Sequence, residues 1–240
     1  MLRKLNRERK EYLLKKRDAT EKGIDDQSSP SSYPPKVLIT TSRDPTNRLL
    51  RFSKELKWTI PNSKRINRGN LVLKELSKLC KEHKITDLII VFEHRGTPDG
   101  ILLSKFPHGP TLTCSLHNVV LRHDIPEVSA RPFREAMPNI ILNNFQTDLG
   151  LKISKHFQSL FPCPNELSKK AIGFMNNEDY ISFRQFTYEA SKDKVELSEE
   201  GPRFEMRPFE LKAGPLDAVD VDPEWSLRSF FKNALNKKHL

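Results

Sequence analysis

The chain has 240 residues, of which 41 are Lys or Arg and 31 are Asp or Glu, so its formal net charge at pH 7 is +10. A positive surplus of this size favours a polyanionic partner such as a nucleic acid. No apolar run approaches the roughly 20 residues that cross a bilayer, and the N-terminus lacks the apolar core of a secretion signal. We therefore expect a soluble, intracellular protein with no membrane partner.

The charge is unevenly distributed along the chain. Residues 1–20 carry a net charge of +5 and residues 45–84 carry +8, whereas residues 189–224 carry −6 and residues 225–240 carry +4. A polyanion is therefore expected to bind mainly before residue 85. The acidic block could repel RNA from one face, bind a basic protein, or be a solvated loop.

The first 35 residues are predicted to lie outside the globular part. Residues 1–22 lack Pro and Gly and are rich in Leu, Lys, Arg and Glu, which predicts a basic helical arm. Residues 23–35 contain four Ser and three Pro and are predicted to be a linker. The arm could lie on RNA, dock on a protein partner, or be disordered on its own.

Residues 36–130 are predicted to form a first α/β half. The expected elements are a strand over 37–41, a helix that follows Pro45 and is capped by Ser42 or Asp44, a helix over 70–84, a strand over 87–92, a turn over 96–100 that leads to a strand over 101–103, and a strand over 111–117. Residues 118–137 are expected to be a less regular connection. The order is βαβα followed by antiparallel strands.

The sequence pattern of residues 131–225 repeats this order, which predicts a second α/β half that shares one extended sheet with the first. Asp44 and Pro61 flank the first helix, and Asp148 and Pro162 flank its counterpart, at spacings of 104 and 101 residues. The candidate strands that follow are 171–175, 180–188, 195–197 and 203–211. A short helix over 225–235 is expected to close the chain, and the segment over 226–240 is assigned to this helix and a basic tail.

The strand over 203–211 has a distinctive pattern. Arg203 and Arg207 lie on one face, opposite Phe204 and Met206, and the alternation changes phase after Pro208. A bulge or bend is expected there. Because proline cannot donate to a strand ladder, we also expect this strand to lie at a sheet edge or to end at the proline.

Motifs for common catalytic chemistry are missing. The sequence contains no GxxxxGK[ST], GxGxxG, GxSxG or HExxH pattern, so we predict no cofactor, no catalytic residue and no metal site. Cys80, Cys114 and Cys163 form no CxxC pair and are expected to be reduced, mostly buried thiols. Glu93 and Asp99 flank a predicted hairpin, and an enzyme could hold Mg²⁺ there, although acidic residues near a turn are common.

Nine residues are candidate RNA ligands because Arg, Lys and Asn side chains bind phosphate and base groups. They are Arg43, Lys64, Arg65, Asn67, Arg68, Asn70, Arg95, Arg203 and Arg207. The run over 64–70 precedes a predicted helix N-terminus, which favours phosphate, although Asn70 could merely cap that helix in a solvated loop. Arg43 and Arg95 each follow a predicted strand, and the last two arginines could instead pair with Glu196, Glu199 or Glu205.

Several of these residues fall in motifs that resemble those of the Brix-domain family. The matching segments run in the family's order from about residue 36 to 225: Thr40-Thr41-Ser42-Arg43-Asp44-Pro45, Arg65-Ile66-Asn67-Arg68-Gly69, Glu93-His94-Arg95-Gly96-Thr97-Pro98, Gly109-Pro110-Thr111, Val119-Val120-Leu121-Arg122-His123-Asp124-Ile125-Pro126, Asp179-Tyr180-Ile181-Ser182-Phe183-Arg184 and Gly201-Pro202-Arg203-Phe204-Glu205. The resemblance implies a Brix domain over residues 36–225, with two duplicated halves that each resemble an anticodon-binding domain.

The resemblance also implies a role in ribosome biogenesis and rRNA processing. The sequence is most similar to members of the family in the U3 small nucleolar ribonucleoprotein, which works in the small-subunit processome of the nucleolus, in the nucleus. The implied partners are U3 snoRNA, pre-rRNA and two other U3 snoRNP-specific proteins, and no catalysis is implied. Residues 201–212 resemble a sigma-factor-like motif that is proposed to bind RNA. Relatives often have a longer charged segment where this chain has its Ser/Pro linker, which leaves the contacts of that segment open.

The leading hypothesis is therefore a non-catalytic scaffold that binds RNA through phosphates and helps U3 snoRNA pair with pre-rRNA. One alternative is a metal-dependent RNA-processing enzyme that uses Glu93 and Asp99. Another is a protein-interaction module without direct RNA binding, whose contact surface lies in residues 189–224 and the closing helix.

Overall fold

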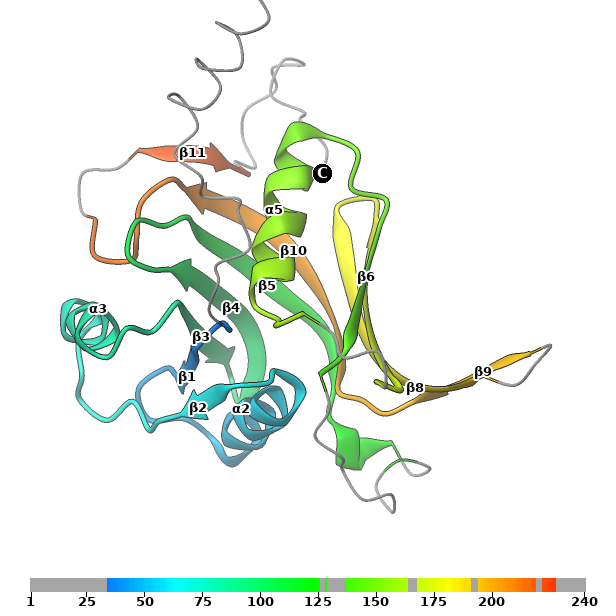
Figure 1. The fold of residues 1–240 in the computed structure, drawn as a ribbon. Coiled ribbons are helices and arrows are strands. Elements are labelled where there is room, and N and C mark those ends of the chain that lie inside the picture. Colours follow the sequence, from blue (N-terminus) through cyan, green and yellow to red (C-terminus); the bar gives the residue numbers. More distant parts are fainter. Residues whose placement is uncertain are drawn as a thin grey trace, which may run out of the picture. The chain divides into compact units, whose positions relative to one another are not determined.

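An eleven-stranded mixed sheet is the framework of the structure (Figure 1). The first half contains β1 (Val37–Thr41), α2 (Asn47–Thr59), β2 (Ser63–Arg65), α3 (Leu73–Glu82), β3 (Asp87–His94), β4 (Thr97–Lys105), β5 (Thr111–Val120) and the 3-10 turn η1 (Arg122–Asp124). The second half contains β6 (Asn139–Asn143), α5 (Asp148–Ser159), β7 (Lys170–Asn177), β8 (Tyr180–Ala190), β9 (Val195–Glu199), β10 (Arg203–Lys212) and β11 (Pro223–Ser226).

The computed structural model describes residues 34–125, 128, 137–163, 168–190, 194–218 and 222–227. All of them belong to one compact unit formed by residues 33–240. The predicted arm over 1–22, most of the predicted linker and the tail beyond residue 227 lie outside the described residues. Within the described part, none of the helices combines the length and the apolar character that a membrane crossing requires.

The two halves repeat one topology and meet in the middle of the sheet. The strand order is β2-β1-β3-β4-β5-β10-β8-β7-β6, with β9 beside β8 and β11 beside β10. In each half the first strand pairs in parallel with the next long strand, which begins an antiparallel set: β1 with β3, and β6 with β7. The antiparallel pair β5–β10 joins the halves. This arrangement confirms the α/β fold class that the sequence predicted.

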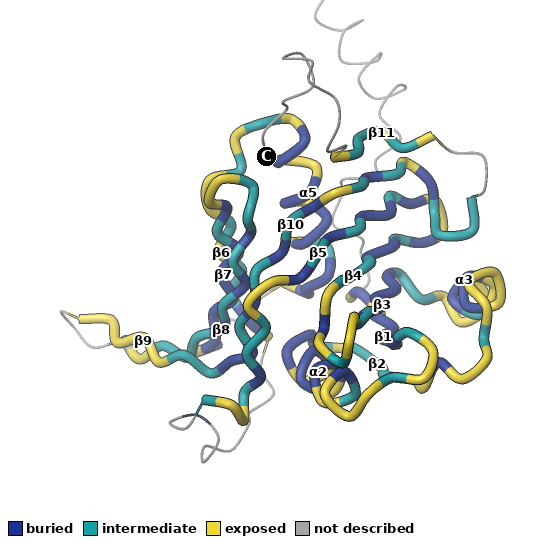
Figure 2. Tube along the Cα trace, turned by 180° about the vertical axis from the view of Figure 1, so that it is seen from behind, coloured by how far each residue is buried: buried dark blue, intermediate teal, exposed yellow. Residues whose placement is uncertain are grey.

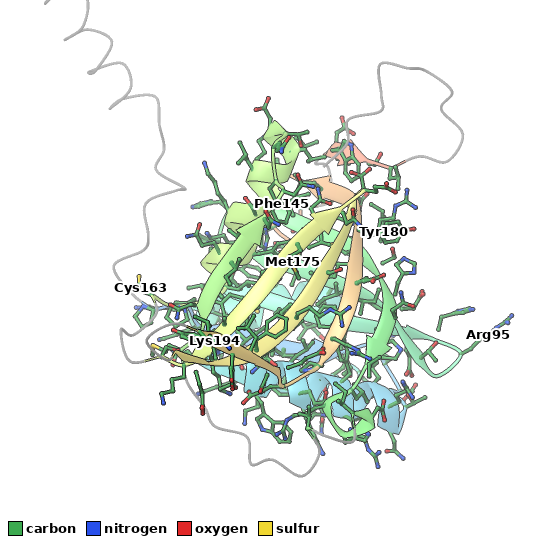
Figure 3. All side chains as sticks on the ribbon, turned by 90° about the vertical axis from the view of Figure 1, so that its right-hand side faces the viewer. Arg95, Phe145, Cys163, Met175, Tyr180 and Lys194 are labelled. Atoms are coloured by element: carbon green, nitrogen blue, oxygen red, sulfur yellow. The ribbon has the colours of Figure 1, made fainter. Side chains whose placement is uncertain are left out.

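Helices cover the two faces of the sheet unequally. In β1, Val37 and Ile39 pack in the larger core with α2 and α5, whereas Leu38 points to the other face and packs with α3. No described helix covers the second half's sheet on the face that α3 covers in the first half, and Met175 and Tyr180 lie on that part of the sheet (Figure 3). Buried positions follow the central strands, whereas β9 is exposed (Figure 2).

A chain of aromatic rings makes one core out of the two halves. Phe52 on α2 meets Phe204 on β10 edge to face, with ring centroids 5.5 Å apart, and Phe204 stacks on Phe183 of β8 at 4.4 Å. Phe183 contacts Phe174 of β7 at 5.3 Å, and Phe174 stacks on Phe157 of α5 at 4.7 Å. Such pairs are worth about 0.5–1.5 kcal/mol each beyond the area they bury. The two halves are therefore packed as a single core.

Three local sequence predictions in the first half need correction. Helix α2 is capped by Thr46, whose hydroxyl accepts from the Leu49 amide at 3.4 Å, rather than by Ser42 or Asp44. Helix α3 begins at Leu73, three residues after Asn70, and the Glu75 carboxylate accepts from the Val72 amide at 2.9 Å. The β3–β4 turn is Arg95-Gly96, both with positive φ, so β4 begins earlier than predicted.

The prediction that the 203–211 strand is an edge strand, or ends at Pro208, is wrong. Strand β10 lies between β5 and β8, and it continues past Pro208 to Lys212. On one side it pairs with β8 over Phe204–Met206 and with β11 over Glu210–Lys212, so Pro208 lies where the neighbouring strand changes. The expected irregularity is confirmed, because the register with β5 shifts between Pro208 and Glu210.

The closing helix that was expected to begin at Trp225 is also not formed there. Trp225 lies in β11, opposite Leu211 of β10, and it packs against the larger core. Pairing with β10 satisfies the backbone groups of β11 that face β10, and it also places the indole against the core. Tertiary packing thus decides the conformation of this segment.

Candidate nucleic-acid interface

The parallel strands at one end of the sheet bring several predicted RNA ligands to a single edge. Strand β1 pairs in parallel with both β2 and β3, so the segments that follow these three strands leave the sheet on the same side. Arg43 follows β1, the loop over 66–70 follows β2, and Arg95 lies in the turn after β3 (Figure 3). We call this surface the basic edge, and it comprises Arg43, Lys64, Arg65, Asn67, Arg68, Asn70 and Arg95.

Arg68 is the buried member of the basic edge. Only 7 % of its surface is exposed, and its Nε donates to the Leu71 carbonyl at 2.7 Å. Burial, together with the positive charge of nearby Arg43, lowers the pKa of Arg68. Among the described residues, neither arginine forms an ion pair with a carboxylate. Two neighbouring cations without a counter-charge favour binding of an anion.

Arg65 fixes the loop against α2. Its Nε donates to the Ser53 hydroxyl at 2.8 Å, and its Nη2 donates to Oδ1 of Asn67 at 2.9 Å. Lys64, Asn67 and Asn70 are exposed around it. Arg65 therefore holds the loop in one conformation while the exposed side chains remain accessible to a ligand.

Glu93 positions the hairpin that carries Arg95. One carboxylate oxygen accepts from the Thr46 amide at 2.9 Å and the other from the Thr46 hydroxyl at 2.5 Å, so Glu93 joins β3 to the N-terminus of α2. Arg95 is exposed at the tip of the hairpin (Figure 3). Both oxygens of Glu93 are thus engaged, and within the described part of the chain no group of three or more His, Cys, Asp or Glu residues could hold a metal ion.

Arg203 and Arg207 lie elsewhere, on β10, and each has a partner within the chain. Arg203 forms an ion pair with Glu199 at 3.3 Å, and Arg184 shares that carboxylate at 3.5 Å. Nη1 of Arg207 donates to the Tyr180 hydroxyl at 3.3 Å, and its Cζ lies 5.1 Å from the Tyr180 ring centroid. The structure therefore does not bring these two arginines together with the basic edge.

The sequence interpretation missed a polar cluster on α2. Glu55 is only 5 % exposed, and its carboxylate accepts from the Arg122 amide at 2.8 Å and from Nδ1 of His123 at 3.2 Å. Burial raises the pKa of Glu55 despite these hydrogen bonds. The available signal was an acidic residue within a basic helix, since Lys54 and Lys57 are close neighbours in sequence. Periodicity alone places Glu55 beside the buried Leu56 without naming its partners.

The three cysteines are unpaired. Cys80 and Cys114 are buried and Cys163 is exposed. Burial raises the pKa of the Cys80 thiol to about 12 and that of Cys114 further still. Two of the three thiols are thus buried, and Cys114 packs in the larger core.

Comparisons with known proteins place this geometry in a family. The model of the Brix domain matches residues 42–210. The U3 small nucleolar ribonucleoprotein protein IMP4 of Eremothecium gossypii is 46% identical over 226 residues, which cover 93% of this chain and 79% of that protein. The protein of the same name from Saccharomyces cerevisiae is 44% identical over 226 residues, which cover 93% of this chain and 77% of the yeast protein.

A solved structure agrees on the fold. The crystal structure of a probable ribosomal biogenesis protein from Aeropyrum pernix K1 superposes with a TM-score of 0.51 at 18% identity, and it covers 72% of this chain and 96% of that one. At this identity the likeness shows the fold alone. The matched domain, the sequence identity and the shared fold together show that the chain belongs to the Brix-domain family.

Proposed function

We propose that this protein is a non-catalytic, RNA-binding assembly factor of the small ribosomal subunit that acts within a U3 small nucleolar ribonucleoprotein. Its RNA partners are U3 snoRNA and pre-rRNA, its protein partners are two other U3 snoRNP-specific proteins, and it works in the nucleolus, in the nucleus. The names of its relatives and its family membership support this assignment. So does the net charge of +10.

The observation that carries the proposal is the unpaired positive charge of the basic edge. Arg43, Lys64 and Arg95 are exposed, Arg68 lies beside Arg43, and none of them forms an ion pair with a carboxylate in the described part of the chain. Phosphate oxygens would supply the missing counter-charges and accept bidentate hydrogen bonds from the guanidinium groups. The paired Arg203 supplies no such unbalanced charge.

Such a surface suits a scaffold. Phosphate contacts fix the orientation of a nucleic acid without reading its sequence, so one surface can hold RNA while bound proteins hold another segment. Two RNA segments held in one particle meet at a high effective concentration, which favours their pairing without any bond being made or broken. The proposed help to U3 snoRNA in pairing with pre-rRNA therefore needs geometry and charge only.

The test is fluorescence anisotropy with a labelled U3 snoRNA fragment over a salt series. The variant Arg43→Glu/Arg95→Glu reverses two exposed charges at the basic edge. The variant Lys155→Glu/Lys169→Glu reverses two exposed charges in the second half and is the matched control, because both variants have the same net charge.

We expect the first variant to weaken binding by about tenfold or more and the control by no more than about threefold. Equal losses of RNA affinity in both variants would mean that the net charge alone determines binding, and they would overturn the assignment of the basic edge. No saturable binding by the wild-type protein at low salt would overturn RNA binding itself.

A further inference from the structure

Thr40 of β1 and Ile141 of β6 occupy equivalent positions in the two halves. Each lies six residues before the threonine that caps the next helix, Thr46 or Thr147, and each is paired in parallel with the next long strand. Thr40 is fully buried, whereas Ile141 is 52 % exposed. A large apolar side chain is therefore open to solvent in the second half where its counterpart in the first half is covered.

Ile141 belongs to a wider apolar surface, which we call the open face. It is the side of β6, β7, β8 and β9 that points away from the larger core, and Figure 3 shows it around Met175. Leu197 of β9 lies opposite Tyr188 of β8 on this face and is 62 % exposed. The residues of the open face used below are Ile141, Ala171, Gly173, Met175, Arg184 and Leu197. Contiguous exposed apolar surface of this kind marks interaction sites.

The first half covers the corresponding face with a helix of its own. Helix α3 packs Leu76 and Cys80 against that side of β1 and β3, and it belongs to a connection of 27 residues over 60–86. The connection between α5 and β7 has only ten residues, over 160–169. Ten residues are too few to join α5 to β7 and also to lay a helix as long as α3 across the opposite face of the sheet.

Small residues occupy the centre of the open face. Gly173 of β7 takes the place of Ile90 of β3, and Ala171 takes that of Leu88, which both pack under α3. A Cβ added to Gly173 would meet only the terminal methyl group of Met175 within 4 Å in the described part of the chain, at 3.8 Å. The strand thus leaves room for large apolar side chains that come from a partner.

The charged side chains of the open face and of the adjoining part of β10 carry a positive surplus. Arg184 and Arg203 share the carboxylate of Glu199, at 3.5 and 3.3 Å. Arg207 and Glu205 follow on the same side of β10. Three arginines thus face two carboxylates, so an acidic partner complements this surface better than a basic one does.

We propose that the open face binds an amphipathic helix of a protein partner, with its apolar residues over Ile141, Gly173 and Leu197 and an Asp or Glu beside Arg184. The site rests on the proposed function and deepens it, because it assigns a surface to one of the two U3 snoRNP-specific proteins. The most exposed side chains of the face are aliphatic, whereas bases stack on aromatic rings, which favours a protein over RNA. The eight residues of β7 extend about 26 Å, so a helix of up to about 17 residues fits along them.

The test measures the affinity of the full chain for each of the two other U3 snoRNP-specific proteins of its organism by biolayer interferometry. Ile141→Asp places a charge on the open face, and Leu151→Asp is the matched control because Leu151 is exposed on α5, on the other side of the sheet. Gly173→Leu adds a large side chain where the helix would pack, and Gly173→Ala adds only a methyl group. Thermal unfolding checks that each variant is folded.

We expect Ile141→Asp and Gly173→Leu to weaken the binding of one of the two proteins by about tenfold or more, and each control by no more than about twofold. A photoreactive benzoylphenylalanine in place of Ile141 should cross-link to one segment of that protein. The segment should have apolar residues three or four positions apart and more Asp and Glu than Lys and Arg. The affinity of Gly173→Leu for the U3 snoRNA fragment should equal that of the wild type.

Unchanged affinity of either Ile141→Asp or Gly173→Leu for both proteins would overturn the helix site and leave the proposed function intact. A cross-linked segment without the helical spacing of apolar residues would also overturn it. So would a loss of RNA affinity in Gly173→Leu, because the open face would then bind RNA. Binding of neither protein by the wild-type chain would refute the proposed protein partners, and the helix site with them.

Discussion

The buried carboxylate of Glu55 on α2 accepts a hydrogen bond from the backbone N–H of Arg122, 67 positions further along the chain. The same carboxylate accepts from His123, so one side chain holds the turn after β5 against the helix. Two hydrogen bonds to one buried charged group fix the position of η1 more firmly than apolar packing alone would. Glu55 thereby ties the turn after β5 to α2.

Glu55→Ala should therefore destabilise the protein by about 2–4 kcal/mol, because it leaves the Arg122 amide and the His123 ring without their acceptor. Glu55→Gln keeps one carbonyl acceptor and should cost about half as much. Urea unfolding at pH 7 measures both. Glu82→Ala is the control, since Glu82 is an exposed partner of Lys78 and should cost under about 0.5 kcal/mol. Equal losses at the two positions would refute the buried role of Glu55.

Single neutral substitutions at the basic edge should change the salt dependence of RNA binding. Arg43→Ala, Lys64→Ala and Arg95→Ala each remove one exposed cation, so each should reduce the slope of log affinity against log salt by about 0.7–0.9. Arg203→Ala should leave the slope unchanged because Arg203 is paired with Glu199. Anisotropy titrations at five salt concentrations give the slopes, and parallel lines for all four variants would exclude phosphate contacts at this edge.

Asp87 should make the protein less stable as the pH rises. It is the first residue of β3 and is 1 % exposed, and burial raises its pKa from 3.8 to about 6. Since the pKa of Asp87 is higher in the folded than in the unfolded state, its contribution to the stability of the fold is fully present below about pH 4 and is lost as the pH rises through about 6. A shift of that size corresponds to at most about 3 kcal/mol.

Asp87→Asn should thus be more stable than the wild type above pH 6, and the difference should shrink toward pH 4. Asparagine has nearly the same shape and can still accept the hydrogen bond that the Thr86 hydroxyl donates to Asp87. Unfolding free energies measured by urea at half-unit pH steps test this. A pH-independent difference would show that Asp87 is ionised in the folded protein throughout this range.

His156 should have the opposite pH dependence. It is buried in α5, and within the described part of the chain neither ring nitrogen has a hydrogen-bond partner. Burial, with a smaller contribution from the charge of Lys105, lowers its pKa from 6.5 to about 4. Because the folded pKa is depressed, the stability it contributes is fully present above pH 6.5 and is lost as the pH falls through about 4.

The variant His156→Leu should therefore retain stability that the wild type loses on acidification. Relative to the variant, the wild type should lose about 3 kcal/mol between pH 6.5 and pH 4. The same urea series measures it. In the wild type this slope opposes that of Asp87, so the two effects partly cancel and only the single variants reveal them. Identical slopes for the wild type and His156→Leu would mean that the imidazole has a partner that shields it.

The loop between β4 and β5 should be intolerant of any side chain at Gly109. This residue has φ +99°, and an added Cβ would lie 2.5 Å from both the Ala213 carbonyl oxygen and the Gly214 carbonyl carbon. Gly109→Ala should cost about 3 kcal/mol or more because backbone atoms must move. Gly69→Ala is the control, with φ +53° but open space around it, and should cost about 1 kcal/mol. Similar costs would mean that the close approach relaxes freely.

The local residue pattern was enough to predict a strand where both faces of that strand are buried. Strands β1 and β3 were predictable because β1 and residues 88–92 of β3 are unbroken runs of apolar or β-branched residues, nearly all of them buried. The predictions for the segments around Pro208 and Trp225 were wrong because the conformations of these segments depend on strands that are distant in sequence. Pro208 is accommodated in the middle of the sheet because β10 changes neighbours there, which no alternation pattern encodes.

The candidate site also has residues that the sequence could predict and residues that it could not. Charge and position after a strand were enough to select Arg43 and Arg95, since parallel strands end on one side of a sheet. Whether an arginine has an acidic partner is a three-dimensional property, so the sequence could not separate the unpaired Arg43 from Arg203, which is bound to Glu199. Glu55 was missed for the same reason, because its partners lie 67 and 68 positions away.

The β5–β10 join also sets an order for synthesis. The edge of β5 is complete when Val120 has been made, but its partner β10 ends at Lys212, about 90 residues later. Because synthesis adds roughly 5–20 residues per second, the nascent chain exposes the unpaired edge of β5 for about 5–20 s. A free strand edge is a template for pairing with other chains. The interval between these two strands is thus the period in which the nascent protein most needs a chaperone or dilution from its own copies.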